Sequence, residues 1–186
     1  MLASLEQEHK GKLKVFLGAA PGVGKTYAML QAVREQAREG VDILIGVVET
    51  HGRQETLALL DKLAIQPRKL HLHRQQRLEE MDLDALLARK PAIVVVDELA
   101  HSNAPGSRHE KRWQDVEELL GAGIDVYSTL NVQHLESLND LVWQLTGVRV
   151  KETLPDQVLL EADSIVLIDL PPKELLGRLK EGKVYV

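Results

Sequence analysis

The sequence predicts an α/β fold in which a mainly parallel sheet carries helices on both faces. Two observations support this prediction. From Leu13 onward, short apolar runs alternate with longer segments in which apolar residues recur every three to four positions, an order typical of strands followed by helices. The run at 92–96, Ala-Ile-Val-Val-Val, contains no polar residue, as expected for a parallel strand covered by helices on both sides.

The first four expected elements alternate strand and helix. The strand at 13–17 is followed by a helix at 26–39, whose apolar residues share one face and which ends before Gly40 at the expected C-cap. A strand is expected at 43–49 because nearly all of its residues are apolar. The helix expected at 53–63 has leucines three to four positions apart.

The middle of the chain continues the same alternation. A short strand is expected at 70–73, and a brief helix at 83–88 ends near Pro91. The strand at 92–96 should lie in the middle of the sheet, since its uninterrupted apolar character suits burial on both faces. A polar loop then leads into a helix at 109–120, where helical spacing returns.

The last third of the chain shows a weaker version of this pattern. Two glycines separate the preceding helix from the next strand, and prolines mark two later helix starts. The expected elements are a strand at 124–130, a helix at 133–145, an extended segment at 148–151, a short helix at 155–161, a strand at 164–169, and a helix at 173–180 after Pro171 and Pro172.

Composition limits the class of protein. The chain has 186 residues, 44% hydrophobic and 27% charged, so we expect one globular domain over 1–186 with a polar lead-in at 1–12. The absence of Cys fits a reducing compartment such as the cytosol. A net charge of −5 argues against nucleic acid as a partner. No apolar run approaches the roughly 20 residues of a membrane helix, so insertion of this chain into a membrane is not expected.

A glycine-rich segment between the first strand and the first helix predicts a phosphate-binding loop and a P-loop NTPase-like sheet. Residues 18–26 read Gly-Ala-Ala-Pro-Gly-Val-Gly-Lys-Thr, the Walker A pattern with Ala19 in place of its first glycine. Backbone N–H groups would surround the phosphates of ATP, Lys25 would reach the β- and γ-phosphates and serve catalysis, and the Thr26 hydroxyl would bind Mg²⁺. The alternative is a glycine-rich turn without a ligand. The residues expected to contact the nucleotide here are Gly22, Val23, Gly24, Lys25, Thr26 and Tyr27.

The strand at 92–96 ends in two acidic residues, Asp97 and Glu98. Ligands of open α/β sheets bind at the carboxyl ends of strands, so Asp97 should face Thr26 and take part in Mg²⁺ binding. Glu98 is the candidate for orienting or deprotonating a nucleophile beside the γ-phosphate. The alternative is that the pair serves as a helix cap or a solvated turn.

Two further strand ends carry polar residues that are expected near the same pocket. Glu49, His51 and Arg53 are candidates for contacts with the γ-phosphate or an acceptor. Asn131 is a candidate for nucleotide binding, and Thr129 or Asn131 for sensing whether the γ-phosphate is present. The alternative interpretation is helix capping by Thr50 and Asn131.

The loop at 101–109 is rich in hydrogen-bond donors and long enough for a lid or a partner-binding loop. Arg108 or Arg112 would stabilise charge on a transferred phosphate, which makes Arg108 a candidate catalytic residue. The alternative is a solvated loop that leads into an amphipathic helix. The histidines lack the spacing of metal ligands, so no zinc site is expected.

Four blocks of sequence, in order, resemble those of one family. They cover residues 18–27, 49–53, 95–109 and 123–140. The phosphate loop is common to many families, whereas the third and fourth blocks are close to family-specific. On these blocks the chain resembles the N-terminal cytoplasmic domain of the KdpD family, the potassium-responsive bacterial sensor histidine kinases. The likeness continues through the segments 156–158 and 171–175.

The resemblance implies an ATP-binding regulatory domain that binds Mg-ATP and modulates the kinase and phosphatase activities of a larger sensor kinase, most of which is absent from this chain. Its partners would be the other domains of that protein, which include a universal-stress-like domain, four membrane spans and a catalytic region, and indirectly the response regulator KdpE. The domain would lie in the cytoplasm, on a parent protein in the bacterial inner membrane. The site residues carried over are Gly22, Gly24, Lys25, Thr26 and Asp97.

Two enzymatic alternatives remain open at this point. In an active ATPase, Glu98 would activate a water molecule and an arginine would complete the site. In a kinase, the γ-phosphate would pass to a protein acceptor with Glu98 or His51 as the base. A regulatory module differs from both because it would bind Mg-ATP with little turnover.

Overall fold

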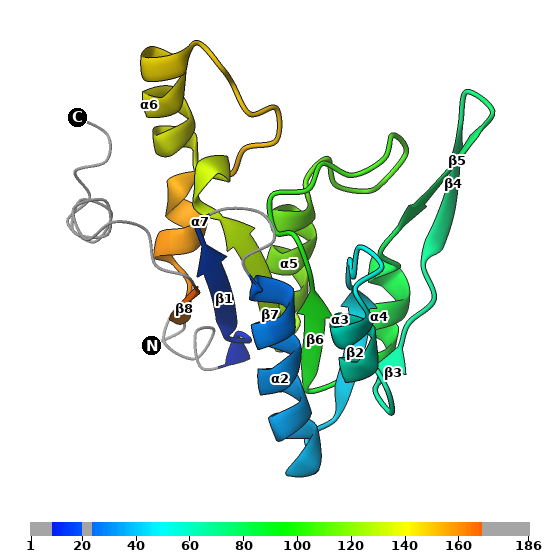
Figure 1. Cartoon of the computed structure of the whole chain (residues 1–186). Coiled ribbons are helices and arrows are strands. Elements are labelled where there is room, and N and C mark those ends of the chain that lie inside the picture. Colours follow the sequence, from blue (N-terminus) through cyan, green and yellow to red (C-terminus); the bar gives the residue numbers. More distant parts are fainter. Residues whose placement is uncertain (1–8, 20–23, 169–186) are drawn as a thin grey trace.

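The computed structural model describes residues 9–19 and 24–168 of the chain. These residues contain a six-stranded sheet with the strand order β3-β2-β6-β7-β1-β8, in which every adjacent pair is parallel (Figure 1). This sheet and its helices confirm the predicted α/β fold. The sheet strands are β1 Leu13–Gly18, β2 Ile43–Val47, β3 Ala64–Ile65, β6 Ile93–Val96, β7 Asp125–Asn131 and β8 Ser164–Ile168.

Helices cover both faces of the sheet. α2 and α3 share one hydrophobic cluster, whereas α4, α5 and α7 contribute to the cluster on the other face. Within the described part of the chain, no helix combines the length and apolar character needed to cross a membrane. The helices are α2 Lys25–Arg38, α3 Gln54–Leu59, α4 Leu83–Arg89, α5 Arg112–Gly121, the 3₁₀ turn η1 Val132–His134, α6 Glu136–Thr146 and α7 Asp156–Leu160.

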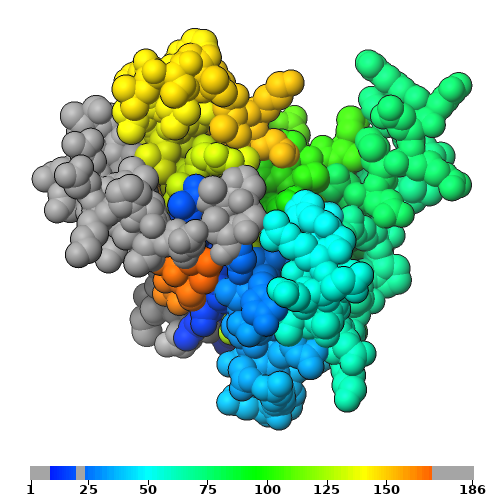
Figure 2. Space-filling model, in the orientation of Figure 1, coloured from blue at the N-terminus to red at the C-terminus, as the bar shows by residue number. Residues whose placement is uncertain are grey.

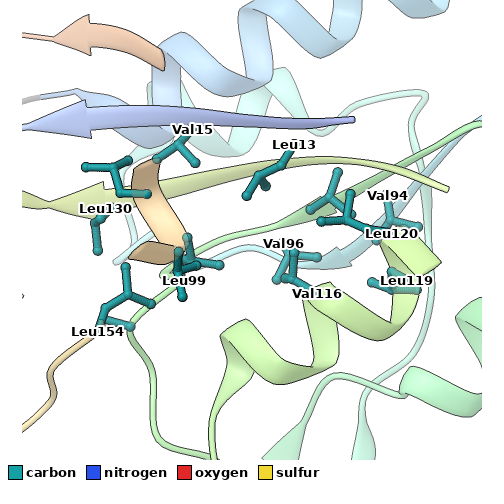
Figure 3. Packing of buried hydrophobic residues seen from close by; sticks show 14 of the residues in the cluster. Leu13, Val15, Val94, Val96, Leu99, Val116, Leu119, Leu120, Leu130 and Leu154 are labelled. Carbon is teal, nitrogen blue, oxygen red and sulfur yellow. The ribbon is translucent and has the colours of Figure 1, made fainter. Parts of the chain in front are cut away.

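β6 lies between β2 and β7, in the interior of the sheet as predicted. Val94 and Val96 belong to one hydrophobic cluster and Ile93 and Val95 to the other, because successive side chains of a strand point to opposite faces. Figure 3 shows Val94 and Val96 in the cluster that also contains residues of α5. Each buried side chain of this size contributes about 1.5–3 kcal/mol, so the strand is held firmly from both faces.

A second, two-stranded antiparallel sheet is formed by β4 Lys69–His73 and β5 Gln76–Glu80. The strand expected at 70–73 is therefore present, while its partner β5 was not predicted. Arg74 and Gln75 form the turn with positive φ angles of 48° and 65°. In Figure 2 the hairpin projects from the body of the molecule, and Leu72 on it is 73% exposed.

Two expected helices differ in extent. The helix predicted at 133–145 is interrupted, because Leu135 has extended backbone angles and is fully buried, and its backbone bridges to Leu154. The helix predicted at 53–63 ends at Leu59, since a turn with Lys62 at a φ of 67° leads directly into β3. The extended segment expected at 148–151 forms no strand.

Some expectations fall on residues that the structure does not describe. They are the polar lead-in up to residue 8, the end of the last strand at Asp169, and the helix at 173–180 with its two prolines. The described part of the last strand, β8, ends at Ile168.

Candidate functional site

A cleft lies where the carboxyl ends of β2, β6 and β7 meet the N-terminus of α2. This is the edge at which open parallel sheets bind ligands. Eleven candidate site residues predicted from the sequence line it: Gly24, Lys25, Thr26, Tyr27, Glu49, His51, Arg53, Asp97, Glu98, Thr129 and Asn131. Three further polar lining residues had no predicted role: Thr56, His134 and Glu152.

The N-terminus of α2 forms one wall of the cleft. Gly24 precedes the helix with a φ of 89°, a left-handed conformation that glycine adopts without strain, and no side chain caps this helix end. The Lys25 side chain is largely buried; burial lowers the pKa of its amine, while the carboxylates of Asp97 and Glu98 act in the opposite direction. A helix N-terminus with a lysine in its first turn favours a phosphate group. Gly22 and Val23 lie outside the described residues.

The Asp97 carboxylate, only 1% exposed, is the centre of the polar network. It accepts hydrogen bonds from the Thr26 hydroxyl, at 3.1 and 3.2 Å, and from the backbone N–H of Glu49, at 3.0 Å. The hydroxyl of Thr129 also donates to it. Residues from α2, β7 and the end of β2 thus converge on one carboxylate, and a hydroxyl beside a carboxylate is a ligand pair suited to Mg²⁺.

Glu98 follows Asp97 in a strained backbone conformation. Its φ of 57° lies in the left-handed region, which non-glycine residues rarely adopt and which tends to occur at functional sites. Its N–H donates to the Thr129 hydroxyl at 2.9 Å, and its Oε1 lies 3.6 Å from His51 Nε2. Burial, and then the charge of Asp97, raises the pKa of the Glu98 carboxyl, although nearby Arg112 opposes the shift.

This shift predicts how stability depends on pH. A carboxyl whose pKa is raised on folding stabilises the protein below the unfolded value of 4.5, and this contribution is lost as pH rises through its folded pKa. Glu98→Gln removes that loss. We expect the free energy of unfolding of the variant, relative to that of the wild type, to rise by about 0.5 kcal/mol from pH 4.5 to pH 8. The effect is small because the side chain is 44% exposed. Urea unfolding at both pH values measures it, and an unchanged difference contradicts it.

Thr50 does not cap a helix, and Asn131 stands at the N-cap position of η1 without capping it through its side chain. The N-cap of α3 is Arg53, and neither that helix nor the turn after Asn131 has a side-chain cap. Instead, Asn131 lines the cleft, and its Oδ1 is buried without a hydrogen-bond partner among the described residues. Since an unpaired buried acceptor is costly, a ligand or an ordered water that donates a hydrogen bond to this atom would relieve that cost.

The two arginines near the loop at 101–109 lie in different environments. Arg108 does not line the cleft; its guanidinium pairs with Asp84 at 2.7 Å and with Glu118 at 2.6 Å on the surface. Arg112 is 2% exposed, and its Nη1 donates to the Asp97 carbonyl at 2.8 Å. The structure therefore brings Arg112, and not Arg108, against the strand end that carries the acidic pair.

The loop itself is tied to its neighbours. Its ends form an antiparallel bridge between Ser102 and Lys111, and the Asn103 N–H donates to the Glu110 carbonyl at 2.9 Å. The backbone N–H of Ser102 also donates to the Glu152 carboxylate, which lines the cleft. No sequence pattern marks Glu152, because it belongs to a stretch without regular secondary structure. Among the described residues, no cluster of three or more His, Cys, Asp or Glu could hold a metal ion.

Comparison with known proteins places this architecture in a family. The family model for the osmosensitive K⁺ channel His kinase sensor domain, KdpD, matches residues 9–186. The chain is 59% identical over 186 residues to the sensor protein KdpD of Escherichia coli strain K12, covering 100% of this chain and 21% of that protein.

Two other relatives give the same result. The KdpD sensor protein of Clostridium acetobutylicum is 53% identical over 97% of this chain, and that of Mycobacterium tuberculosis strain H37Rv is 51% identical over 95%. The chain spans about a fifth of the length of these three proteins. The chain therefore belongs to the KdpD family, as an osmosensitive K⁺ channel His kinase sensor domain.

Proposed function

We propose that this chain binds Mg-ATP in the cleft and acts as the nucleotide-binding regulatory domain of a potassium-responsive sensor histidine kinase. The observation that carries the proposal is the pairing of Thr26, at the start of α2, with the buried carboxylate of Asp97 at the end of β6. Nucleotide-binding α/β proteins use a hydroxyl and an acidic residue in these two places to hold the metal of a Mg-nucleotide.

Each group around the cleft has a distinct part in the proposal. The N-terminus of α2 and the Lys25 amine would bind the phosphates, since both favour negative charge. Thr26 and Asp97 would hold Mg²⁺, and the Asn131 oxygen, which has no partner among the described residues, would accept a hydrogen bond from the nucleotide or its water shell. Bound Mg²⁺ neutralises phosphate charge and orients the γ-phosphate.

The larger role follows from the relatives, each named a KdpD sensor protein. Because this chain corresponds to about a fifth of their length, we propose that its nucleotide state is passed to other domains of a parent protein. Through them it would set the balance between kinase and phosphatase activity, and indirectly the phosphorylation of the response regulator KdpE. The domain would face the cytoplasm, with its parent in the bacterial inner membrane.

An active ATPase is the second candidate, favoured by the position of Glu98. Its carboxylate lines the cleft beside Asp97 in a strained conformation, and its raised pKa suits a group that accepts a proton from water. A kinase that passes the γ-phosphate to a protein acceptor would need the same bound Mg-ATP. Both alternatives therefore share the binding step and differ in where the phosphate goes.

The test incubates the purified chain with Mg-ATP labelled at the γ-phosphate and follows the label. The regulatory proposal expects it to co-elute with the protein as intact ATP. Release as inorganic phosphate supports the ATPase, and covalent label on protein supports the kinase. Nucleotide binding is contradicted if two results occur together. One is that no label stays with the protein when the chain is well above ATP in concentration, and the other is that calorimetry detects no heat of binding.

A further inference from the structure

Glu80 is a buried acidic residue that the cleft does not include. It is the last residue of β5, at the base of the projecting hairpin, and is 7% exposed. Three donors face its two carboxylate oxygens: His101 Nε2 at 3.0 and 3.1 Å, the Ala104 N–H at 2.9 Å and Arg112 Nη2 at 3.5 Å. Because a carboxylate only accepts, the His101 ring nitrogen is the donor.

The ionised form of Glu80 is the one that these contacts favour. Burial raises the pKa of its carboxyl, but the hydrogen bonds from His101 and Ala104 and the charge of Arg112 outweigh burial and lower it overall. Each oxygen of this buried carboxylate faces two donors, so its position is fixed, and losing a donor weakens the compensation for its buried charge.

Arg112 connects Glu80 to the cleft. It is the first residue of α5, and its side chain is 3% exposed. Its Nη2 faces Glu80, while its Nη1 donates to the carbonyl oxygen of Asp97 at 2.8 Å, and its own N–H donates to the His101 carbonyl at 3.0 Å. A planar guanidinium held at two points cannot rotate freely, so it transmits the position of one partner to the other.

The carbonyl that Arg112 holds belongs to the peptide joining Asp97 to Glu98. The N–H of the same peptide donates to the Thr129 hydroxyl at 2.9 Å, so both polar groups of the peptide are hydrogen-bonded and its orientation is fixed. Directly after it, Glu98 adopts its left-handed φ of 57°. Such a conformation persists only where surrounding contacts enforce it.

We propose that Glu80 is a positioning residue for the acidic pair, acting through Arg112 on the peptide between Asp97 and Glu98. The hairpin base and the cleft are then coupled. A displacement of Glu80 turns that peptide, and binding of a nucleotide in the cleft shifts Glu80 at the base of the hairpin. This inference builds on the proposed nucleotide site, whose binding it regulates, and coupling of this kind acts equally in both directions.

Amide hydrogen exchange of the unliganded chain tests the positioning role without any nucleotide. In Glu80→Gln one carboxylate oxygen becomes an NH₂ group, which donates and does not accept, so a single oxygen remains for three donors. We expect the amides of Glu98 and Leu99, bonded to the Thr129 hydroxyl and carbonyl, to exchange about tenfold faster. The matched control is Glu79→Gln, an adjacent exposed position, where exchange should not change.

Two outcomes overturn the proposal. One is unchanged exchange at Glu98 and Leu99 in Glu80→Gln. The other is equal acceleration throughout β1 and β7, which indicates a general loss of stability. Arg112→Lys, which cannot donate to Asp97 and Glu80 with the same fork, gives a second route. Its effect and that of Glu80→Gln should be less than additive in the double variant, and full additivity contradicts a shared path.

Titration with Mg-ATP then separates this inference from the proposed function. Glu80→Gln should bind Mg-ATP about tenfold more weakly than Glu79→Gln, with little change for ATP in the presence of a chelator, because the displaced group is the Mg²⁺-binding strand end. If the wild type binds Mg-ATP and the two variants bind it with equal affinity, the proposed coupling between Glu80 and the cleft is wrong. If the wild type binds no nucleotide, the proposed function fails, and the amide exchange still decides whether Glu80 positions the acidic pair.

Discussion

Lys25→Ala is expected to weaken Mg-ATP binding about 30- to 150-fold, or roughly 2–3 kcal/mol. The Lys25 amine is largely buried beside the N-terminus of α2, among the groups that we assign to the phosphates. Because this amine is already largely removed from water, a phosphate would form a charge-assisted hydrogen bond with it at little further desolvation cost. Isothermal titration of both proteins with Mg-ATP measures the loss.

The matched control for this variant is Lys12→Ala. Lys12 is exposed in the segment before β1 and does not line the cleft, so its removal changes the net charge of the chain by the same amount without touching the site. Its affinity should stay within about twofold of wild type, since an exposed charge at a distance is screened by salt. Equal weakening in both variants would assign the effect to net charge and reject the role of Lys25.

Gly11→Ala is expected to destabilise the fold by about 3 kcal/mol or more. A Cβ at this position would lie 2.0 Å from the carbonyl oxygen of Ile124 and 2.4 Å from its carbonyl carbon, and these are backbone atoms that cannot turn aside. The Gly11 N–H also donates to the Leu120 carbonyl at 2.8 Å, which holds the two segments close. Relief of the clash requires the approach to β1 to move away from the junction of α5 and β7.

Gly121→Ala provides the comparison. Gly121 is the last residue of α5, and nothing lies within 4 Å of a Cβ built there. Because alanine favours helix over glycine by about 1 kcal/mol, this variant should be as stable as the wild type or slightly more stable. The midpoints of urea unfolding distinguish the two variants, provided the slope of the transition is unchanged. Similar midpoints contradict the steric argument for Gly11.

The location of the cleft could be predicted because its main features depend on consecutive residues. An apolar run followed by Asp97 is enough to place that residue at the carboxyl end of an interior strand, and a strand, glycine-rich loop and helix place Thr26 at the same edge. The contact between the two side chains then follows from the parallel arrangement.

The hairpin could not be predicted because β5 lacks the usual strand signal. Its sequence, Gln-Arg-Leu-Glu-Glu, contains a single apolar residue, Leu78, so no alternation is visible. The turn uses Arg74 and Gln75 where Asn-Gly is the common choice for two left-handed residues. β5 therefore depends on main-chain pairing with β4 and on the buried contacts of Glu80, which local sequence does not reveal.

The roles of the two arginines show the same limit. Arg108 and Arg112 stand four positions apart in a polar, basic stretch, and nothing in that stretch distinguishes them. Their environments are set by Asp84 and Glu80, acidic residues on the hairpin side of the fold. Which arginine is buried depends on acidic partners that are distant in the sequence, and local sequence patterns do not identify such partners.

The strand order has a consequence for how the protein is made. Among the described strands, β1 pairs only with β7 and β8, and with none of the strands that the sequence places between β1 and β7: Leu13 is opposite Val126, and Lys14 is opposite Ser164. During synthesis the apolar residues of β1 cannot be fully buried until both partner strands have left the ribosome. Contacts so distant along the chain close slowly. Before those contacts form, β1 presents exposed apolar residues to which a chaperone or another nascent chain can bind.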